Sequence, residues 1–310
     1  MAAYLLFGTG LVCAAVGGEL FVRGLIGLAR RTGVPVGIIG ATVAAFATSS
    51  PELSVALSSA AAGTPQLALG DAIGSNIVNV SLVLGLPLLI ARLAAPPEAI
   101  RRDLPVALVA PLLTAGLLFD GRLSRIEAGV MLLLFLAWLV TTALEARRRR
   151  DATTAALDSE SPWVMAARLS GGIVLLFAAG QLIVAGALGV ARALGVDLYL
   201  VGALAVAVGT SAPEIATAVV AQLRRHGEIT LGVILGSNIF NGLFIVPVAA
   251  LIHPIAANFN EAVIGLGFGV VVTALVYPGS RGLMTRRRGA VLILLWLAYI
   301  LAQLQARPAI

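Results

Sequence analysis

Two acidic side chains lie within strongly apolar stretches of this 310-residue chain, each behind two hydroxyls and a proline. Glu52 ends the stretch ATSSPE (residues 47–52), and Glu214 ends the stretch GTSAPE (residues 209–214). An ionised carboxylate is costly in hydrocarbon, so such a residue is by default functional. The proline lacks a backbone N–H and interrupts the helix, which frees nearby carbonyl oxygens. Carboxylates, hydroxyls and carbonyls together indicate a site for a hard cation.

A second polar stretch follows each glutamate. It reads GSNIVN at residues 74–79 and GSNIFN at residues 236–241, so that a Ser and an Asn lie four positions apart, on one face of a helix. Two carboxylates match the charge of one divalent ion, and Ca²⁺ takes about 6–8 oxygen ligands, while the same oxygens also suit Na⁺. The sequence has no His and Cys cluster of the kind that binds zinc or copper.

Both polar stretches recur after an offset of 162 residues, and the register holds from about Gly18 to Asn79 without a gap. The same offset aligns Gly24 with Gly186, Arg30 with Arg192, Gly33 with Gly195, Gly40 with Gly202 and Gly70 with Gly232. Chance similarity between apolar segments would not keep Thr, Ser, Pro, Glu and two Asn in step. We therefore infer an internal duplication.

The elements that must position these residues are transmembrane helices. The chain is 59% hydrophobic and 12% charged, with a mean hydropathy of +1.01, which is too apolar for a soluble domain. We predict an all-α polytopic membrane protein with ten transmembrane helices. The predicted spans are 2–29, 34–62, 66–91, 103–119, 126–145, 163–191, 198–222, 229–252, 262–278 and 289–305. The first and sixth exceed the roughly 20 residues that a helix needs to cross a bilayer, so they should be tilted or protrude.

The arginines set the predicted orientation. With the N-terminus outside, cytoplasmic loops carry sixteen arginines and the opposite side carries four. The positive-inside rule then places both termini outside, in a plasma or inner membrane. Five spans separate each motif from its copy. Because five is odd, we predict two inverted five-helix repeats, residues 1–146 and 163–310, joined by a cytoplasmic linker at residues 147–162. Repeats of this kind bind substrate near the bilayer midplane, between interrupted helices.

Other protein classes fit the composition less well. A net charge of +6 would suit nucleic acid, but the arginines form short clusters between apolar runs, so we expect the lipid bilayer and no nucleic acid as a partner. The single cysteine, Cys13, excludes a disulfide framework. The first apolar run lacks a basic leader and is longer than the core of a signal peptide, which predicts a retained transmembrane helix.

The segments GATVAAFATSSPEL with GDAIGSNIVN, and GALAVAVGTSAPEI with GVILGSNIFN, resemble the two α-repeats of the sodium/calcium exchanger family of cation/calcium antiporters. GGELFVRGLIGLARRTGVP and AGQLIVAGALGVARALGVD also resemble the helices that precede each repeat. The family type is the prokaryotic one without a large cytoplasmic insert. The resemblance implies a transporter rather than an enzyme, with no prosthetic group, that exchanges Ca²⁺ for Na⁺. It also implies that the first and sixth helices slide together across the other eight.

The resemblance further implies a set of ligands. Glu52 and Glu214 would bind Ca²⁺ directly and share Na⁺ sites, and Asn79 and Asn241 would close the central site. The other implied ligands are the hydroxyls of Thr48, Ser49, Thr210, Ser211, Ser75 and Ser237 and the backbone carbonyls of Ala45 and Ala207.

Three positions depart from the family pattern. Ala47 stands where the family usually has Gly, which would stiffen the first helix break. Ser50 replaces a common apolar residue and adds a hydroxyl near the site. Asn241 stands where some members carry an acid, which leaves two carboxylates rather than three and bears on ion selectivity and coupling stoichiometry.

Structural interpretations compete with these assignments. Lone hydroxyls favour helix packing in membranes, and the asparagines of the site would also serve as interhelical hydrogen bonds. An arginine could neutralise the glutamates, but Arg23, which lies within the first span, is placed to pair with Glu19. Asp71 either draws cations into an outer vestibule or lies at a solvated helix end. We assign no role to His226 or His253.

Several functions fit a buried site of this kind. Na⁺-coupled Ca²⁺ antiport is favoured, because a proton needs no cage of hydroxyls and carbonyls. H⁺-coupled antiport on the same scaffold is the alternative, since two nearby carboxylates can hold a proton in place of the counter-ion, and a K⁺-dependent exchanger is a variant of it. A cation channel would also line a pore with acids and carbonyls, but would need no counter-ion. An intramembrane hydrolase would need an aspartate pair, a metal cluster or a Ser–His pair, and both histidines lie at span ends.

Overall fold

The computed structural model describes residues 2–150, 161–194, 209–257, 259–278 and 282–305, and these are largely helical. The helical segments are α1 (Ala2–Thr32), α2 (Val36–Ile39), η1 (Gly40–Ala44), α3 (Ala45–Thr48), α4 (Ser50–Ala61), α5 (Gln66–Val78), η2 (Asn79–Val83), α6 (Gly85–Ile90), η3 (Ala99–Asp103), α7 (Leu104–Leu117), η4 (Leu118–Asp120), α8 (Arg125–Arg148), α9 (Pro162–Leu194), α11 (Ala212–Leu223), α12 (Gly227–Phe240), η6 (Asn241–Ile245), α13 (Val246–Ile252), α14 (Phe259–Ala274) and α15 (Arg286–Gln305). The strands are β1 (Leu93–Ala94), β2 (Arg122–Leu123), β3 (Ile255–Ala256) and β4 (Leu283–Met284).

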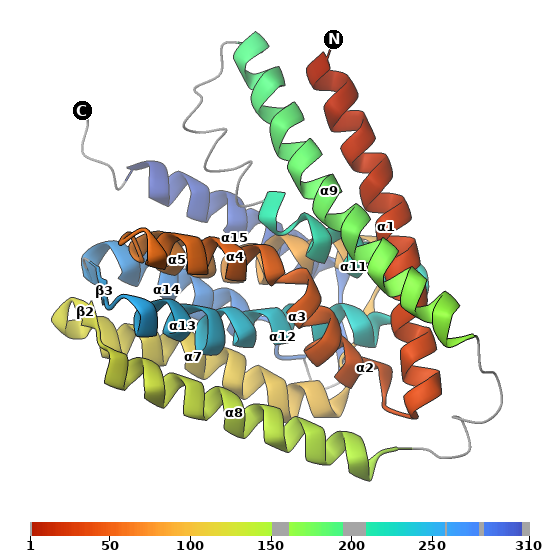
Figure 1. Cartoon of the computed structure of the whole chain (residues 1–310), viewed down its shortest axis with the longest axis horizontal. Coiled ribbons are helices and arrows are strands. Elements are labelled where there is room, and N and C mark those ends of the chain that lie inside the picture. The colour runs from red at the N-terminus through yellow and green to blue at the C-terminus, as the bar shows by residue number, and fades with distance from the viewer. Residues whose placement is uncertain (1, 151–160, 195–208, 258, 279–281, 306–310) are drawn as a thin grey trace.

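The two longest helices, α1 and α9, lie side by side and cross the other helices (Figure 1). They pack antiparallel through glycines. A Cβ added at Gly10 would lie 2.8 Å from Ile183 Cγ1, and one at Gly24 would lie 2.8 Å from Leu169 Cγ. Small residues let membrane helices approach this closely. The predicted first and sixth spans therefore form one closely packed pair.

The centre of the remaining helices is α12, which packs against η1, α3 and α11 and also contacts α7, while its continuation α13 lies between α4 and α8 (Figure 1). All residues of α12 from Ile229 to Phe240 are buried. It packs directly on the backbone of η1, because a Cβ at Gly236 would lie 2.2 Å from the Ala41 carbonyl oxygen. The second polar stretch of the second copy therefore lies in the middle of the protein.

The helix interruption predicted at the first polar stretch is confirmed. The segments Val36–Thr48 and Ser50–Ala61 meet at an angle of 45°. Ser49 lies at the break with φ −86° and ψ 12°, and Pro51 occupies the first turn of α4, where a missing N–H costs nothing. Ser211 has nearly the same backbone, φ −82° and ψ 5°, at the start of α11.

Six helices of the described part of the chain are long and apolar enough to cross a membrane, or seven if the bent pair is one span. They coincide with seven of the predicted spans, with boundaries that differ by at most four residues. The other three predictions, 198–222, 262–278 and 289–305, correspond to α11, α14 and α15, which do not meet that test of length and apolarity; residues 198–208 lie outside the described part. The protein is an all-α, multi-pass membrane protein.

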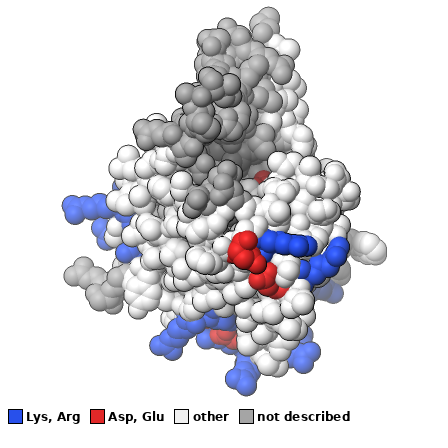
Figure 2. All heavy atoms as spheres, turned by 90° about the vertical axis from the view of Figure 1, so that its left-hand side faces the viewer, with Lys and Arg blue, Asp and Glu red and all other residues white. Residues whose placement is uncertain are grey.

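The surface agrees with a lipid environment. Large apolar side chains are exposed along α1 and α8, among them Leu5 and Leu133, each 66% exposed. Figure 2 shows charged side chains in a few clusters, with broad uncharged areas between them. Exposed apolar surface of this extent is expected where helices face hydrocarbon.

Short strands and arginines join the two halves of the chain at their ends. β1 pairs with β4 and β2 pairs with β3, both antiparallel. Arg125 donates to the carbonyls of Leu251 and Ile252 at 2.8 and 3.0 Å, and Arg286 donates to the carbonyl of Ile90 at 2.8 Å. Each arginine satisfies the open carbonyls at the end of a helix in the other half.

Candidate cation site

The two glutamates are buried and lie close to one another. Glu52 is 1% exposed in the first turn of α4, and Glu214 is 0% exposed in the first turn of α11. The Ser49 hydroxyl, three residues before Glu52, donates to Glu214 Oε1 at 3.3 Å. Because Ser49 lies within one helical turn of Glu52, this bond brings both carboxylates to one site. The structure therefore brings together the two residues on which the sequence analysis depends.

Hydroxyls of the first copy surround the carboxylates. Ser75 on α5 donates to Glu52 Oε1 at 3.3 Å. Thr48 donates to the Ala44 carbonyl at 3.0 Å and also lies beside the Glu214 carboxylate. Each glutamate therefore has one oxygen that accepts a hydrogen bond from a serine hydroxyl.

Several other buried oxygens have no hydrogen-bond partner in the described part of the chain. They are Glu52 Oε2, Glu214 Oε2, Asn79 Oδ1, Asn241 Oδ1, Ser211 Oγ, Ser237 Oγ and Thr217 Oγ1. Buried polar atoms in folded proteins are almost always bonded, so a group of unpaired ones needs an explanation. Six of the seven belong to the residues that the sequence analysis selected. Oxygen atoms without donors, next to two carboxylates, are suited to bind a cation.

The asparagines of the site are held by two others that the sequence analysis did not select. Asn79 Nδ2 donates to Asn238 Oδ1 at 3.2 Å, and Asn241 Nδ2 donates to Asn76 Oδ1 at 3.0 Å. The interhelical hydrogen bonds considered for Asn79 and Asn241 therefore exist. They use the side-chain NH₂ groups, and the side-chain Oδ1 atom of each residue has no partner in the described part of the chain. The signal for Asn76 and Asn238 was their recurrence at the same offset in both copies.

Thr217 carries the seventh unpaired oxygen, Oγ1, and the sequence analysis did not select this residue. It lies on α11, one turn beyond Glu214, and is fully buried. The equivalent position of the first copy is Val55, so comparison of the two copies gave no sign of it.

The remaining predicted ligands have mixed outcomes. Ala45 is buried on α3, and its carbonyl accepts from the Ser49 N–H at 3.0 Å and from the Thr48 hydroxyl at 3.4 Å. Thr210 is half-buried just before α11. Ala207 lies outside the described residues. The Ser50 hydroxyl donates to the Phe46 carbonyl at 3.0 Å, so it is satisfied locally.

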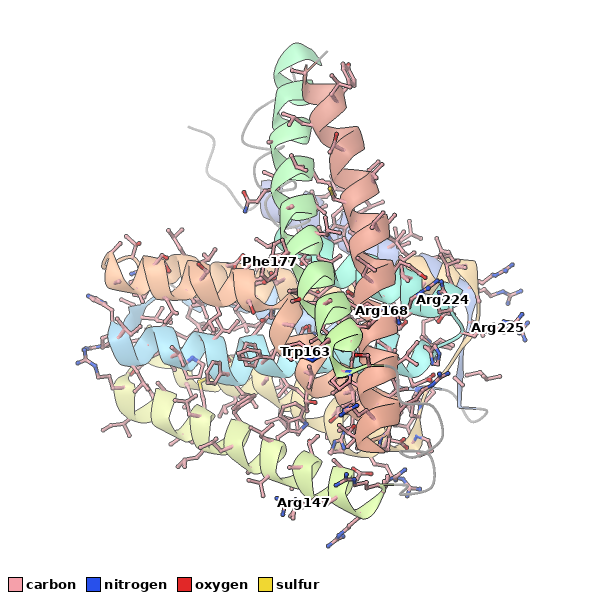
Figure 3. All side chains as sticks on the ribbon, turned by 45° about the vertical axis from the view of Figure 1, so that its right-hand side comes forward. Arg147, Trp163, Arg168, Phe177, Arg224 and Arg225 are labelled. Carbon is pink, nitrogen blue, oxygen red and sulfur yellow. The ribbon has the colours of Figure 1, made fainter. Side chains whose placement is uncertain are left out.

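The structure also places two acidic residues that the sequence analysis considered, Asp71 and Glu19. Asp71 is partly buried inside α5 rather than at a solvated helix end. Glu19 accepts from Arg23 Nε at 2.5 Å, as expected, and also from Arg224 at the end of α11 (Figure 3). The Glu19–Arg224 pair therefore connects α1 to the end of α11.

The histidines lie apart from these residues. His226 contacts Glu228 at 2.9 Å and His253 contacts the Pro254 carbonyl at 3.1 Å. In the described ranges no three His, Cys, Asp or Glu side chains come together as a metal cluster. The donor set of the candidate site is therefore carboxylate, hydroxyl and amide oxygen.

Comparison with known proteins agrees with this geometry. The family model described as sodium/calcium exchanger protein matches residues 2–144 and 165–305. A putative antiporter, CaxA of Alkalimonas amylolytica, is 32% identical over 94% of this chain and 95% of its own. The sodium/calcium exchanger MaX1 of Methanosarcina acetivorans is 26% identical over 96% and 97%.

Solved structures extend the similarity to three dimensions. The sodium-calcium exchanger NCX_Mj, soaked with zero Na⁺ and Ca²⁺, has a TM-score of 0.82 and 28% identity and covers 97% of this chain and 98% of its own. The same exchanger soaked with 2.5 mM Na⁺ and 0.1 mM Ca²⁺ has a TM-score of 0.81. Sequence, fold and buried oxygens lead to one conclusion: the chain belongs to the sodium/calcium exchanger protein family, whose members are transporters.

Proposed function

We propose that the protein is a secondary antiporter that exchanges Ca²⁺ for Na⁺ by alternating access at one buried site. The observation that supports this most is the meeting of Glu52 and Glu214 among six unpaired oxygens of predicted ligands. Two carboxylates balance one Ca²⁺, and the hydroxyls and carbonyls suit Na⁺ as well. The proposed ligands are Thr48, Ser49, Glu52, Ser75, Asn79, Thr210, Ser211, Glu214, Ser237 and Asn241, with the carbonyls of Ala45 and Ala207.

The proposed topology has ten spans in two inverted repeats, residues 1–146 and 163–310, with a cytoplasmic linker at 147–162. Both termini lie outside, in a plasma or inner membrane. Support comes from the short π-helices Asn79–Val83 and Asn241–Ile245, which stand at equivalent positions of the two copies. The strand pairs and arginine contacts, which each join one half to the other, agree with it.

The charge of the site gives a mechanism for obligatory exchange. Without an ion, the two carboxylates repel one another in surroundings of low dielectric constant. Binding of Ca²⁺, or of Na⁺ in its place, neutralises them. If only the neutral carrier crosses the intermediate state, then the carrier must bind ions again before it returns, so exchange is obligatory and leak is suppressed. The pair α1 and α9 is the element proposed to slide, since it packs on itself through glycines.

Uptake of Ca²⁺ into proteoliposomes, with Na⁺, H⁺ and K⁺ gradients applied separately, tests the proposal. We expect uptake to depend on an outward Na⁺ gradient and to be lost in Glu52→Gln and Glu214→Gln. Glu228→Gln is the matched control, because Glu228 lies outside the site beside His226. Uptake driven by a pH gradient without Na⁺ would instead establish H⁺-coupled antiport. Unchanged flux in both glutamine variants would disprove the site.

A further inference from the structure

Four asparagine side chains from the two copies form a closed set of hydrogen bonds. Asn76 Nδ2 donates to the backbone carbonyl of Asn238 at 3.2 Å, and Asn238 Nδ2 donates to the carbonyl of Asn76 at 3.1 Å. The two side-chain oxygens left over accept the amide groups of Asn241 and Asn79. We refer to these four residues as the asparagine ring.

The ring has one consistent assignment of donors and acceptors. A backbone carbonyl can only accept, so the NH₂ groups of Asn76 and Asn238 must face the carbonyls. Their Oδ1 atoms then point the other way, toward Asn241 and Asn79, which must present NH₂ groups in turn. Amide orientation is often ambiguous, but here each choice follows from the one before it. The side-chain Oδ1 atoms of Asn79 and Asn241 remain; they are buried and have no hydrogen-bond partner in the described part of the chain.

We propose that Asn76 and Asn238 are positioning residues that turn the side-chain Oδ1 atoms of Asn79 and Asn241 toward the transported cation. The proposal rests on the cation site of the proposed function and adds the residues that orient it. Partners behind a metal ligand commonly set its orientation in this way. The ring also requires a hydrogen-bond donor at position 241, because an ionised acid there would face Asn76 Oδ1. It therefore keeps the negative charge of the site on the two glutamates.

A double-mutant cycle separates positioning from a general structural role. We would measure the Ca²⁺ dissociation constant of the purified full-length protein by calorimetry for Asn76→Leu, Asn241→Leu and the double variant. Leucine has the same branched arrangement of side-chain heavy atoms as asparagine and no polar atom. Each single change should weaken Ca²⁺ binding about tenfold or more, as for other partners of metal ligands. The double variant should bind no more weakly than the weaker single variant, because Asn76 acts through Asn241.

The chain supplies a matched control for this cycle. Asn76 does not bond to the side chain of Asn79 and shares with it only the partner Asn238, so Asn76→Leu and Asn79→Leu should couple less strongly than Asn76→Leu and Asn241→Leu. Asn238 with Asn79 should show the same coupling as Asn76 with Asn241. If a leucine variant does not purify as folded protein, the same cycles are run with alanine.

Two outcomes would overturn the inference. One is Asn76→Leu with unchanged Ca²⁺ affinity and a lower melting temperature, which is the result for a residue that only joins the halves. The other is equal coupling in the Asn76–Asn241 and Asn76–Asn79 cycles. If the unmodified protein binds neither Ca²⁺ nor Na⁺, the proposed function itself fails. If it binds Ca²⁺ and Glu52→Gln abolishes binding, but the cycles are additive, only the positioning role fails.

Discussion

The Ser49 hydroxyl donates to Glu214 Oε1 at 3.3 Å, whereas Ser211, the equivalent residue of the second copy, has a buried hydroxyl without a partner among the described residues. The same difference exists between Ser75, which donates to Glu52, and Ser237, which is unpaired. Two nearly identical sequence motifs therefore form an asymmetric site. Ser49 and Ser75 of the first copy donate to the carboxylates, whereas Ser211 and Ser237 of the second copy have no hydrogen-bond partner in the described part of the chain.

This asymmetry predicts that the same substitution at two equivalent serines changes different quantities, the stability of the ion-free protein for one and ion binding for the other. Ser49→Ala removes a donor from a buried carboxylate, so the ion-free protein should lose about 1–3 kcal/mol of stability. Ser211→Ala removes an unpaired polar atom, so the ion-free protein should keep its stability but bind Ca²⁺ or Na⁺ more weakly. Thermal unfolding without ions, followed by ion titration, measures both quantities. Equal losses of ion-free stability in the two variants would contradict the asymmetry.

The Glu19–Arg224 pair predicts an effect on conformation rather than on stability. Both side chains are partly exposed, at 31% and 42%, and such a pair contributes about 0–1 kcal/mol. Glu19→Gln should therefore leave the melting temperature nearly unchanged, yet it should lower the population of the conformation in which α1 touches α11. Spin-label distances between these helices would report the shift.

Salt provides an internal comparison for this pair. Raising ionic strength screens exposed charges, so it should shift the unmodified protein in the same direction as Glu19→Gln and have little effect on that variant. Arg23→Gln is the control, since it leaves the Glu19–Arg224 contact in place. A spin-label distance that responds to salt equally in all three proteins would rule out this role for the pair.

Polar residues within apolar sequence were sufficient to predict the centre of the site. A buried glutamate is costly enough that two of them at a fixed offset, each with the same hydroxyls and proline, leave few alternatives to a binding site. Spacing along one helix also placed Ser75 and Asn79 on one face. Spacing does not show which residues of the other copy lie opposite, so the role of Asn76 and Asn238 appeared only in the structure.

Local geometry describes two of the residues that the sequence analysis considered. The Ser50 hydroxyl donates to the carbonyl four residues earlier, a bond that helical serines commonly form. Asp71 was considered as a helix end, but α5 begins at Gln66, so Asp71 lies inside it.

The duplication also extends further than the sequence register indicated. Gly121 and Gly282 both have positive φ, 82° and 65°, directly before β2 and β4. They stand 161 residues apart rather than 162, so a one-residue deletion lies between the motifs and this turn. Apolar helices of similar composition conceal such a shift, because almost any register aligns them equally well.

The contact of α12 with η1 predicts a strict requirement for glycine. Gly236→Ala would place a Cβ 2.2 Å from the Ala41 carbonyl oxygen, a backbone atom that cannot move aside. We expect a loss of at least about 3 kcal/mol of stability, or no folded protein. Gly267→Ala on α14 is the control, because its Cβ would meet no described atom within 4 Å and alanine favours the helix. Melting temperatures close to that of the unmodified protein in both variants would show that the two segments are not in backbone contact.

The α1–α9 pair allows binding and transport to be separated. Gly172→Ala would place a Cβ 2.7 Å from the Phe21 backbone nitrogen and push the two helices apart, whereas a Cβ at the neighbouring Gly171 meets no described atom within 4 Å. The cation site is built by other helices, so Gly172→Ala should still bind Ca²⁺. Because the pair is proposed to move as one unit, Na⁺-driven Ca²⁺ uptake should fall about tenfold or more, and Gly171→Ala should keep its rate. Uptake in Gly172→Ala at the rate of Gly171→Ala would show that the close glycine packing is not needed for movement, and parallel loss of binding would show that the pair shapes the site.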